Sequence, residues 1–174
     1  IKHMQGNDTQ VNRTNSVLFL VRVNDTNLGE FVSGANCSFW VMLNDTHWDS
    51  GNLTMSNSSG YCNYTFTPNA SYSVGQRWWK AGTYQDVYYQ DSNSTNYTVG
   101  IYGKLNVNLT LPNQNFTRLV NTNLLAKIYD EFGSTVKIEG YNCIWYIDDI
   151  YRATRSTNSS GYCNYTWPTS CSDS

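Results

Sequence analysis

The residues best suited to covalent chemistry in this sequence are its five cysteines, four of which recur in matched contexts. Cys37 and Cys143 each follow an asparagine and come shortly before a tryptophan, and Cys62 and Cys163 each lie within Gly-Tyr-Cys-Asn-Tyr-Thr. The matched positions predict the disulfides Cys37–Cys62 and Cys143–Cys163. Each bridge would close a loop of about 20–26 residues and stabilise the fold by about 3–4 kcal/mol.

Zinc ligation is the competing interpretation of these cysteines. Structural zinc sites use closely spaced pairs of Cys and His, but the sequence has no Cys-x-x-Cys pair and only two histidines, His3 and His47. His3 lies in an Ile-Lys-His-Met start that is either a mature end or a cloning remnant. We therefore expect no metal site and no cofactor. The fifth cysteine, Cys171, has no counterpart in the first half of the chain, which predicts an intermolecular disulfide or a free thiol.

Asparagine offers a second kind of covalent chemistry. The acceptor pattern for N-glycosylation, Asn-x-Ser/Thr without a central proline, would arise by chance about once or twice in a chain of this length. It occurs here at Asn7, Asn12, Asn24, Asn36, Asn44, Asn52, Asn57, Asn63, Asn69, Asn93, Asn96, Asn108, Asn115, Asn158 and Asn164. We expect many of these sites to carry covalent N-glycans. The alternative is a β protein that is merely rich in Asn, Ser and Thr.

Four of these sequons have an apolar or aromatic central residue. They are residues 63–65, 96–98, 108–110 and 164–166. Successive side chains of a strand point to opposite faces. The central residue would then fill the core while the asparagine and threonine face water, so the same three residues predict both a buried face and a sugar-bearing face.

The other reactive side chains form no recognisable catalytic set. With His47 as the only histidine outside the suspect N-terminus, no Ser-His-Asp arrangement can be assembled, and no glycine-rich phosphate loop is present. Asp45, Asp49 and the pair Asp148-Asp149 are candidates for calcium, although carboxylates in turns are usually just solvated. No spacing of acids singles out a glycosidase pair. We expect that the protein is not an enzyme.

Tryptophan supports a different hypothesis, a carbohydrate-binding module in which exposed indoles stack on sugar rings. Most of the tryptophans lie within strand patterns, which favours core packing instead. The six are Trp40, Trp48, Trp78, Trp79, Trp145 and Trp167.

The elements that must position these residues come in two copies. Residues 57–65 recur without change as 158–166, and residues 32–37 align with 138–143. An identity of this length indicates a duplication. The duplication predicts a unit over 13–103 and a related unit over 104–174, after an N-terminal extension over 1–12.

Strands are the expected elements of both units. Apolar residues alternate with polar ones over 37–43, 97–101 and 105–111, which is the period of a half-buried strand. The segment 119–130 also favours a strand. Turn-forming clusters such as 57–60 separate the strands. Short strands at this spacing predict an all-β fold of two tandem β-sandwiches.

The second unit is expected to lack the last strands. In the first unit, the segments 78–82, 87–89 and 96–102 follow Cys62 and should complete the sandwich, whereas the sequence ends shortly after Cys163. An incomplete sandwich exposes an apolar groove and unpaired sheet edges. One interpretation is strand addition from another copy, with 5–14 as the donor; the other is a truncated chain or a smaller strand set.

Composition and the length of the apolar runs exclude a nucleic-acid partner and a membrane-spanning helix. Charged residues make up 14% of the chain and the formal net charge is −2. The sequence therefore contains no basic stripe suited to a nucleic-acid backbone. Its apolar runs are also far shorter than the roughly 20 residues that a membrane-spanning helix needs. We expect neither a nucleic-acid partner nor a membrane-spanning segment.

Several motifs resemble the immunoglobulin-like repeats of bacterial and archaeal cell-surface proteins. They are Val-x-Gly-Ala-x-Cys-x-Phe, Asn-Ser-Ser-Gly-Tyr-Cys-x-Tyr-Thr-Phe-x-Pro, Tyr-Ser-Val-Gly, Trp-Trp-Lys-Ala and Tyr-Tyr, at 32–39, 57–68, 72–75, 78–81 and 88–89. The resemblance covers 13–103 well and 104–170 in part. Domains of this family are spacers, stalks and assembly units of cell envelopes. The density of sequons is most similar to that of archaeal S-layer, sheath or filament proteins.

The resemblance implies that both β-sandwiches are immunoglobulin-like and that the protein is extracellular, at the cell surface or envelope. We expect a structural subunit that polymerises with other copies of itself into a filament, sheath or surface layer by strand complementation. The alternative is a carbohydrate-binding or adhesive immunoglobulin-like module or stalk of a surface protein.

Overall fold

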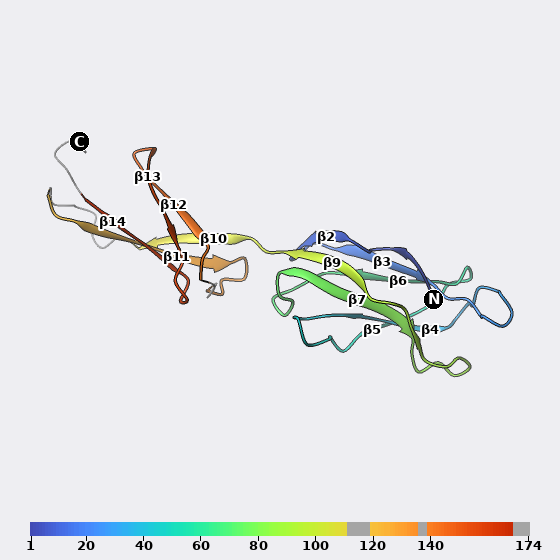
Figure 1. The fold of residues 1–174 in the computed structure, drawn as a ribbon. Helices are drawn as coiled ribbons and strands as arrows, with labels where there is room; N and C mark the ends of the chain where they lie inside the picture. Colours follow the sequence, from blue (N-terminus) through green and yellow to red (C-terminus); the bar gives the residue numbers. More distant parts are fainter. Residues whose placement is uncertain (111–118, 136–138, 169–174) are drawn as a thin grey trace. The chain divides into compact units, whose positions relative to one another are not determined.

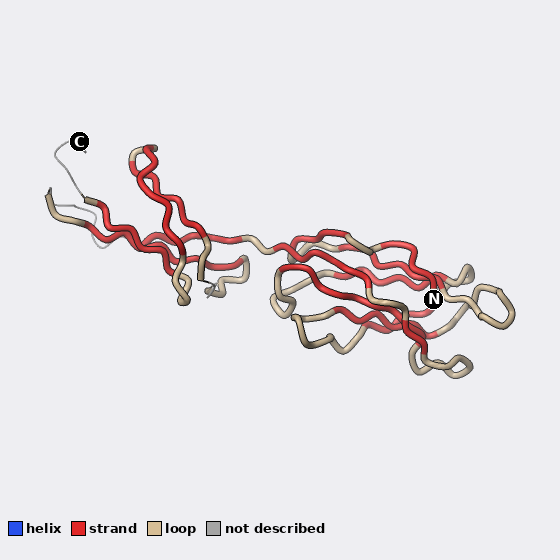
Figure 2. The backbone as a smooth tube through the Cα atoms, viewed as in Figure 1, coloured by secondary structure: helices blue, strands red, loops and turns tan. Residues whose placement is uncertain are grey.

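The regular elements of the protein are all strands in the part of the chain that the computed structural model describes, residues 1–110, 119–135 and 139–168 (Figures 1 and 2). The chain divides into two compact units, Ile1–Gly103 and Lys104–Ser174. Within the described residues, no helix is long and apolar enough to cross a membrane. Asn115 and Cys171 lie outside these residues.

Unit 1 is a sandwich of two sheets. Its strands are β1 (Lys2–Gln5), β2 (Thr9–Asn12), β3 (Val17–Arg22), β4 (Asn36–Val41), β5 (Asn52–Met55), β6 (Tyr61–Phe66), β7 (Gly75–Thr83), β8 (Ser92–Asn93) and β9 (Tyr97–Tyr102). One sheet has the order β1-β3-β6 and the other the order β2-β9-β7-β4-β5, with β8 paired to β7. The chain crosses from one sheet to the other between β3 and β4, between β5 and β6 and again between β6 and β7, as in an immunoglobulin-like sandwich. The predicted fold class is confirmed.

Residues 1–12 belong to this sandwich and do not form an extension before it. β1 pairs with β3, and β2 pairs in parallel with β9. Between them, the carbonyl of Gly6 accepts a hydrogen bond of 3.1 Å from the indole N–H of Trp79. A Cβ at Gly6 would stand 2.6 Å from the Phe19 ring, so this close approach requires glycine. The segment 5–14, expected as a donor strand, is therefore already engaged within its own unit.

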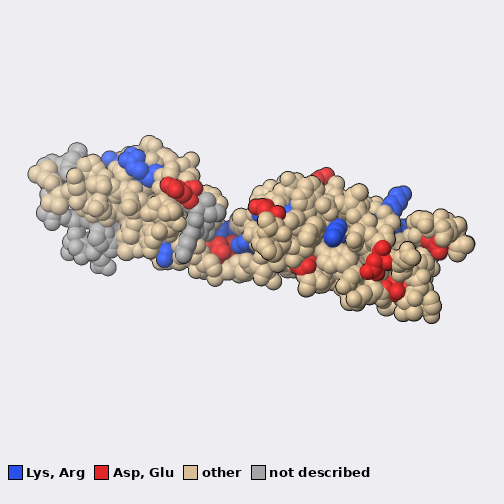
Figure 3. Space-filling view, turned by 60° about the horizontal axis from the view of Figure 1, so that its bottom comes forward, with Lys and Arg blue, Asp and Glu red and all other residues tan. Residues whose placement is uncertain are grey.

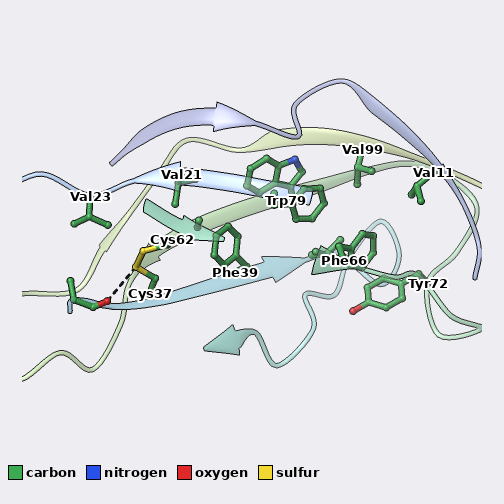
Figure 4. Packing of buried hydrophobic residues seen from close by; sticks show 14 of the residues in the cluster. Val11, Val21, Val23, Cys37, Phe39, Cys62, Phe66, Tyr72, Trp79 and Val99 are labelled. Carbon is green, nitrogen blue, oxygen red and sulfur yellow. Dashed lines mark hydrogen bonds between the residues drawn. A yellow bond between two sulfur atoms is a disulfide. The ribbon is translucent and has the colours of Figure 1, made fainter. Parts of the chain in front are cut away.

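The core of unit 1 is aromatic. The ring of Trp79 stacks on that of Phe19 with 4.2 Å between the ring centroids. The ring of Phe66 also stacks on that of Phe19, with 5.3 Å between the centroids. All three side chains are fully buried, and Figure 4 shows Trp79 and Phe66 between the two sheets. The disulfide Cys37–Cys62 joins β4 to β6 and so links one sheet to the other.

The segment 87–89 is a loop, although we expected a strand there. The carboxylate of Asp86 accepts hydrogen bonds from the backbone N–H groups of Tyr88 at 2.8 Å and Tyr89 at 3.1 Å. An aspartate that caps its own following backbone in this way forms a turn. Val87 and Tyr88 are 82% and 89% exposed as a result.

Unit 2 has a smaller set of strands in its described residues. They are β10 (Leu105–Thr110), β11 (Thr122–Asp130), β12 (Asn142–Ile147), β13 (Ile150–Ser156) and β14 (Tyr162–Trp167). One sheet has the order β10-β11-β14, and β12 and β13 form a hairpin. The disulfide Cys143–Cys163 joins β12 to β14. Leu124 and Ala126 of β11 pack with Trp145 of β12 in the core.

The two units place equivalent strands in equivalent positions. The duplicated segment forms β6 in unit 1 and β14 in unit 2, and each pairs with its counterpart, β3 or β11. The two disulfides likewise join corresponding strands. Among the described residues of unit 2, no strand corresponds to β7 or β9.

Candidate functional site

The largest run of exposed apolar side chains in a strand of unit 2 is one face of β10. Leu105, Val107 and Leu109, which we call the β10 face, are 42%, 61% and 56% exposed. Val107 lies opposite Ile128 and Leu109 lies opposite Ala126 in the antiparallel pair with β11. Residues directly opposite each other project to the same face of a sheet. Because Ile128 and Ala126 are buried, the β10 face continues the core side of its sheet.

Unit 1 shows what covers the equivalent position. His3 of β1 lies opposite Val21, and Leu109 of β10 lies opposite Ala126. Val21 and Ala126 in turn lie opposite the equivalent cysteines of β6 and β14, so His3 and Leu109 occupy equivalent positions. The His3 ring lies 5.8 Å from that of Trp79 on β7 and 4.5 Å from that of Tyr97 on β9. In unit 1, two further strands therefore cover this place with aromatic rings. The described residues of unit 2 supply no such cover.

The backbone of unit 2 is open at the same side. In unit 1, β4 forms hydrogen-bonded ladders with both β5 and β7. In the described residues of unit 2, β12 pairs with β13 and has no strand on its other edge. An unpaired edge presents a row of N–H and C=O groups to which another strand can add. The exposed β10 face and this edge of β12 together make up the candidate site in the described residues of unit 2.

The hairpin β12–β13 turns through two aspartates. Asp148 and Asp149 have φ values of 52° and 60°, and Ile147 lies opposite Ile150 across the turn. Two consecutive residues with positive φ are the signature of a type I′ turn. The structure thus assigns these aspartates, which were candidates for calcium, to a tight hairpin turn.

The other calcium candidates have protein partners. Asp49 accepts hydrogen bonds from the Tyr72 hydroxyl and from two backbone N–H groups, and Asp45 forms an ion pair with the buried Arg77. In the described part of the chain, no three His, Cys, Asp or Glu residues lie together so as to hold a metal ion.

The sequon asparagines lie at the surface of the described structure. Fourteen of the fifteen are described, and none of these is buried; Asn36, Asn44 and Asn52 are half-buried and the others are exposed. In the turns before β6 and β14, Asn57 and Asn158 each accept hydrogen bonds from two backbone N–H groups at 3.0 Å. These bonds use the side-chain oxygen and leave the nitrogen that glycosylation modifies.

The four strand sequons differ in how they face. Tyr64 is half-buried and Tyr165 is buried, while the flanking Asn and Thr are exposed, as the alternation predicts. Thr98, in contrast, is buried, because its backbone N–H and C=O groups bond to Asn7 and Asp8 of the N-terminal segment. In the sequon of β10, the central residue is exposed because nothing in the described residues covers that face.

The tryptophans divide between core and surface. Those that are buried are Trp79 and Trp145, those that are half-buried are Trp40, Trp48 and Trp167, and the exposed one is Trp78. Core packing, expected for most of them, thus holds fully for two. On the outer face of unit 1, the Lys80 ammonium lies 5.4 Å from the Trp40 ring and 4.9 Å from the Trp48 ring, within the range of cation–π attraction.

A second cation–aromatic contact recurs in both units and was missed from the sequence. The Arg22 guanidinium lies 4.7 Å from the ring of Tyr61, and the Lys127 ammonium lies 5.2 Å from the ring of Tyr162. The cation stands directly opposite the tyrosine in both ladders. The duplicated segment shows that the two tyrosines are equivalent. It does not show which cation lies opposite each tyrosine, because that depends on the strand register.

Charge does not mark a site on the face drawn in Figure 3. Lysines, arginines and acidic residues are scattered there among uncharged residues. This distribution agrees with the small net charge of the chain and offers no concentrated field to attract a charged partner.

Comparison with known proteins gives similarity of structure only. No protein-family model matches the chain, and no curated protein matches it. Among solved structures, it is similar to the CbhA fibronectin(III)-like modules of Clostridium thermocellum, at 14% identity and a TM-score of 0.32, over 92% of this chain and 74% of that one. It is also similar to a tetra-tandem repeat in the extending region of a large adhesion protein, at 12% identity and a TM-score of 0.41, over 95% of this chain and 40% of that one.

Escherichia coli alpha-2-macroglobulin is a further structural match, at 11% identity and a TM-score of 0.40, over 96% of this chain. The chain spans only 12% of that protein's length. At these values, none of the similarities carries an argument about function.

Proposed function

We propose that the protein is a non-catalytic structural subunit of an extracellular cell-envelope assembly, in which strands from a neighbouring copy complete the second unit. The observation that carries this proposal is the exposed β10 face, which continues the core side of its sheet without a covering strand in the described residues. The assembly is a filament, sheath or surface layer. The archaeal setting rests on the density of sequons alone.

Strand addition would give this contact both strength and direction. Burying the exposed part of each β10 side chain contributes about 1 kcal/mol, and backbone hydrogen bonds along the open edge of β12 add to it. A contact in which the second unit of one copy accepts strands from another is heterologous, so it can propagate into a polymer. Cys171 could then lock the joint as a disulfide with another copy.

The extracellular setting agrees with the covalent features of the chain. Both units carry a disulfide, and disulfides persist mainly in oxidising environments outside the cytosol. N-glycans at the fifteen sequons would coat the surface of the protein. Neither feature implies catalysis.

Sedimentation velocity of the full chain tests the proposal. The chain should form oligomers that grow with concentration, and Val107→Lys should abolish them, because a buried lysine at the joint is strongly unfavourable. Val107 is already 61% exposed, so the lysine should leave the fold of the subunit intact. Asn106→Lys, one residue away on the opposite face of β10, is the matched control and should still assemble. A chain that stays monomeric at all concentrations would refute the proposal.

A second candidate function, an adhesive or carbohydrate-binding module, is favoured by one observation. Trp78 is 47% exposed on the outer face of unit 1, two residues before Lys80, which lies between two indoles. Affinity electrophoresis in gels that contain soluble polysaccharides would test it. Trp78→Ala should abolish any retardation. If the wild-type chain migrated freely in every gel, the carbohydrate-binding function would be refuted and only the structural role would remain.

A further inference from the structure

A shallow groove on unit 1 is lined by a glycan acceptor and by exposed apolar side chains. The groove has a volume of about 230 Å³, and its lining includes Asn36 of β4, Leu53 and Met55 of β5, and Tyr84 just after β7. Leu53 and Met55 are 68% and 62% exposed. Asn36 lies directly opposite Met55 in the ladder between β4 and β5, so the two side chains share one face of the sheet.

The protein holds Asn36 in place through two hydrogen bonds. Its backbone N–H donates to the Asp86 carboxylate at 2.7 Å, and its side-chain Nδ2 donates to the Gln85 carbonyl at 3.2 Å. A side-chain amide carries two N–H hydrogens. One of them makes the bond to Gln85, which leaves the other for substitution.

We propose that Asn36 carries an N-glycan whose innermost sugar occupies this groove and covers Leu53 and Met55. The C–H face of the sugar ring would remove apolar surface of both side chains from water. Because Asn36 itself lines the groove, a sugar attached to it needs no further reach to enter. This inference concerns unit 1 and stands independently of assembly through unit 2.

The transfer balances with a lipid-phosphate-linked oligosaccharide as the donor. The bond between the sugar C1 and the phosphate oxygen breaks, and a bond between C1 and Nδ2 forms. The phosphate leaves with the electron pair, and the amide loses one proton to a base of the transferase. The remaining N–H keeps the hydrogen bond to Gln85.

The fold restricts when this modification can take place. Ser38, whose hydroxyl completes the sequon, is 2% exposed, and Cys37 between them is bonded to Cys62. β4 lies between β5 and β7 in its sheet. The sequon can therefore reach a transferase only before β4 pairs. The sequon of Asn57 lies in an exposed turn before β6 and is accessible in the folded unit.

Glycopeptide mapping of two preparations tests the site and its timing. In the chain secreted from a eukaryotic cell, where transfer precedes folding, Asn36 and Asn57 should both be occupied. In folded, oxidised and unglycosylated chain given a purified oligosaccharyltransferase and its lipid-linked donor, Asn57 should be modified and Asn36 should not. An empty Asn36 beside an occupied Asn57 in the secreted chain would overturn the proposal, as would equal modification of both in the folded chain.

Oxidation of Met55 tests whether the sugar lies in the groove. Ser38→Ala removes the acceptor sequon but keeps Asn36, and hydrogen peroxide should then convert Met55 to its sulfoxide at least about threefold faster than in the secreted wild type. The rate at Met4 on β1 should not change. Ser59→Ala, which removes the sequon of Asn57, is the matched control and should leave Met55 protected.

Equal rates at Met55 with and without the Asn36 glycan would overturn the placement of the sugar. Intact Cys37–Cys62 and an unchanged near-ultraviolet circular dichroism spectrum would show that Ser38→Ala folds. If it does not fold, Asn36→Gln replaces it and should give the same rise in the rate at Met55.

Discussion

Tyr72 and Asp49 connect three segments of unit 1 through one carboxylate. The Tyr72 hydroxyl donates a hydrogen bond of 2.8 Å to Asp49, whose other oxygen accepts bonds of 3.1 Å from the backbone N–H groups of Val41 and Gly51. Burial, and then the hydrogen bond and negative charge of Asp49, raise the pKa of Tyr72 well above its usual range. Loss of the tyrosine proton would place two negative charges together.

We predict that this pair makes the stability of unit 1 depend on alkaline pH. With a raised pKa in the folded state, the contribution of Tyr72 is fully present below about pH 10, where the unfolded tyrosine begins to ionise, and it falls as the pH rises further. Tyr72→Phe should lower the free energy of unfolding by about 1 kcal/mol at neutral pH. It should also flatten the fall above about pH 10, as urea unfolding would measure.

A parallel decline of both proteins above about pH 10 would contradict this prediction. Some slope should remain in Tyr72→Phe, because burial also raises the pKa of Tyr64. The matched control is Tyr88→Phe. Since Tyr88 is 89% exposed, this change should leave the free energy of unfolding unchanged at each pH.

At the scale of elements, the hairpin β12–β13 is joined by a turn whose second residue is poorly suited to its conformation. Asp148 and Asp149 both have positive φ, a region that few residues other than glycine, asparagine and aspartate adopt. Asn-Gly and Asp-Gly are favoured pairs in a type I′ turn, so Asp148 fits its position and Asp149 stands where glycine is preferred. The ladder of β12 with β13 and the packing of Trp145 hold the hairpin in spite of Asp149.

We predict that Asp149→Gly stabilises unit 2 by about 0.5–1 kcal/mol, because glycine adopts positive φ without steric cost. Asp149→Val should have the opposite effect and destabilise unit 2 by more than about 1 kcal/mol. Hydrogen exchange at the Ile147 and Ile150 amides would report both changes. If the two variants shifted protection in the same direction, the turn would not limit the hairpin.

The strands that sequence analysis found are those in which alternation and turns agree. Residues 61–66 and 162–167 alternate between apolar and polar side chains after an Asn-Ser-Ser-Gly turn, and they form β6 and β14. The segment 87–89 has an aromatic, strand-like composition, but the Asp86 carboxylate captures its backbone N–H groups. Local hydrogen bonding of this kind competes with sheet formation and leaves little trace in the pattern.

The candidate site was only partly predictable for a different reason. Alternation over 105–111 showed which side chains of β10 share a face, but it cannot show whether a second layer covers that face. Cover depends on strands far away in sequence, as with β7 over β1 in unit 1. The sequence did not predict β1 and β2, because both strands are short and polar. The hydrogen bond from the Trp79 indole to the Gly6 carbonyl fixes the segment that joins them.

At the scale of the whole molecule, the two units differ in how much apolar surface they bury. Among the described residues, the core cluster of unit 1 contains sixteen buried residues, including four phenylalanines or tryptophans that stack, and that of unit 2 contains six. Since burial supplies most of the stabilising free energy of a small domain, unit 2 should be the less stable. Its disulfide is correspondingly more important to it.

We predict that the full chain shows two calorimetric transitions and that the lower one belongs to unit 2. Cys143→Ala/Cys163→Ala should lower that transition alone, because the bridge contributes about 3 kcal/mol to its unit. If neighbouring copies complete unit 2, association stabilises its folded form, and the lower transition should rise with protein concentration. Val107→Lys should remove the concentration dependence, and Asn106→Lys should keep it. For a tightly associated state, a hundredfold rise in protein concentration should increase the free energy of unfolding of unit 2 by about 2.7 kcal/mol. If the lower transition stayed at one temperature over that range, unit 2 would be stable without a partner.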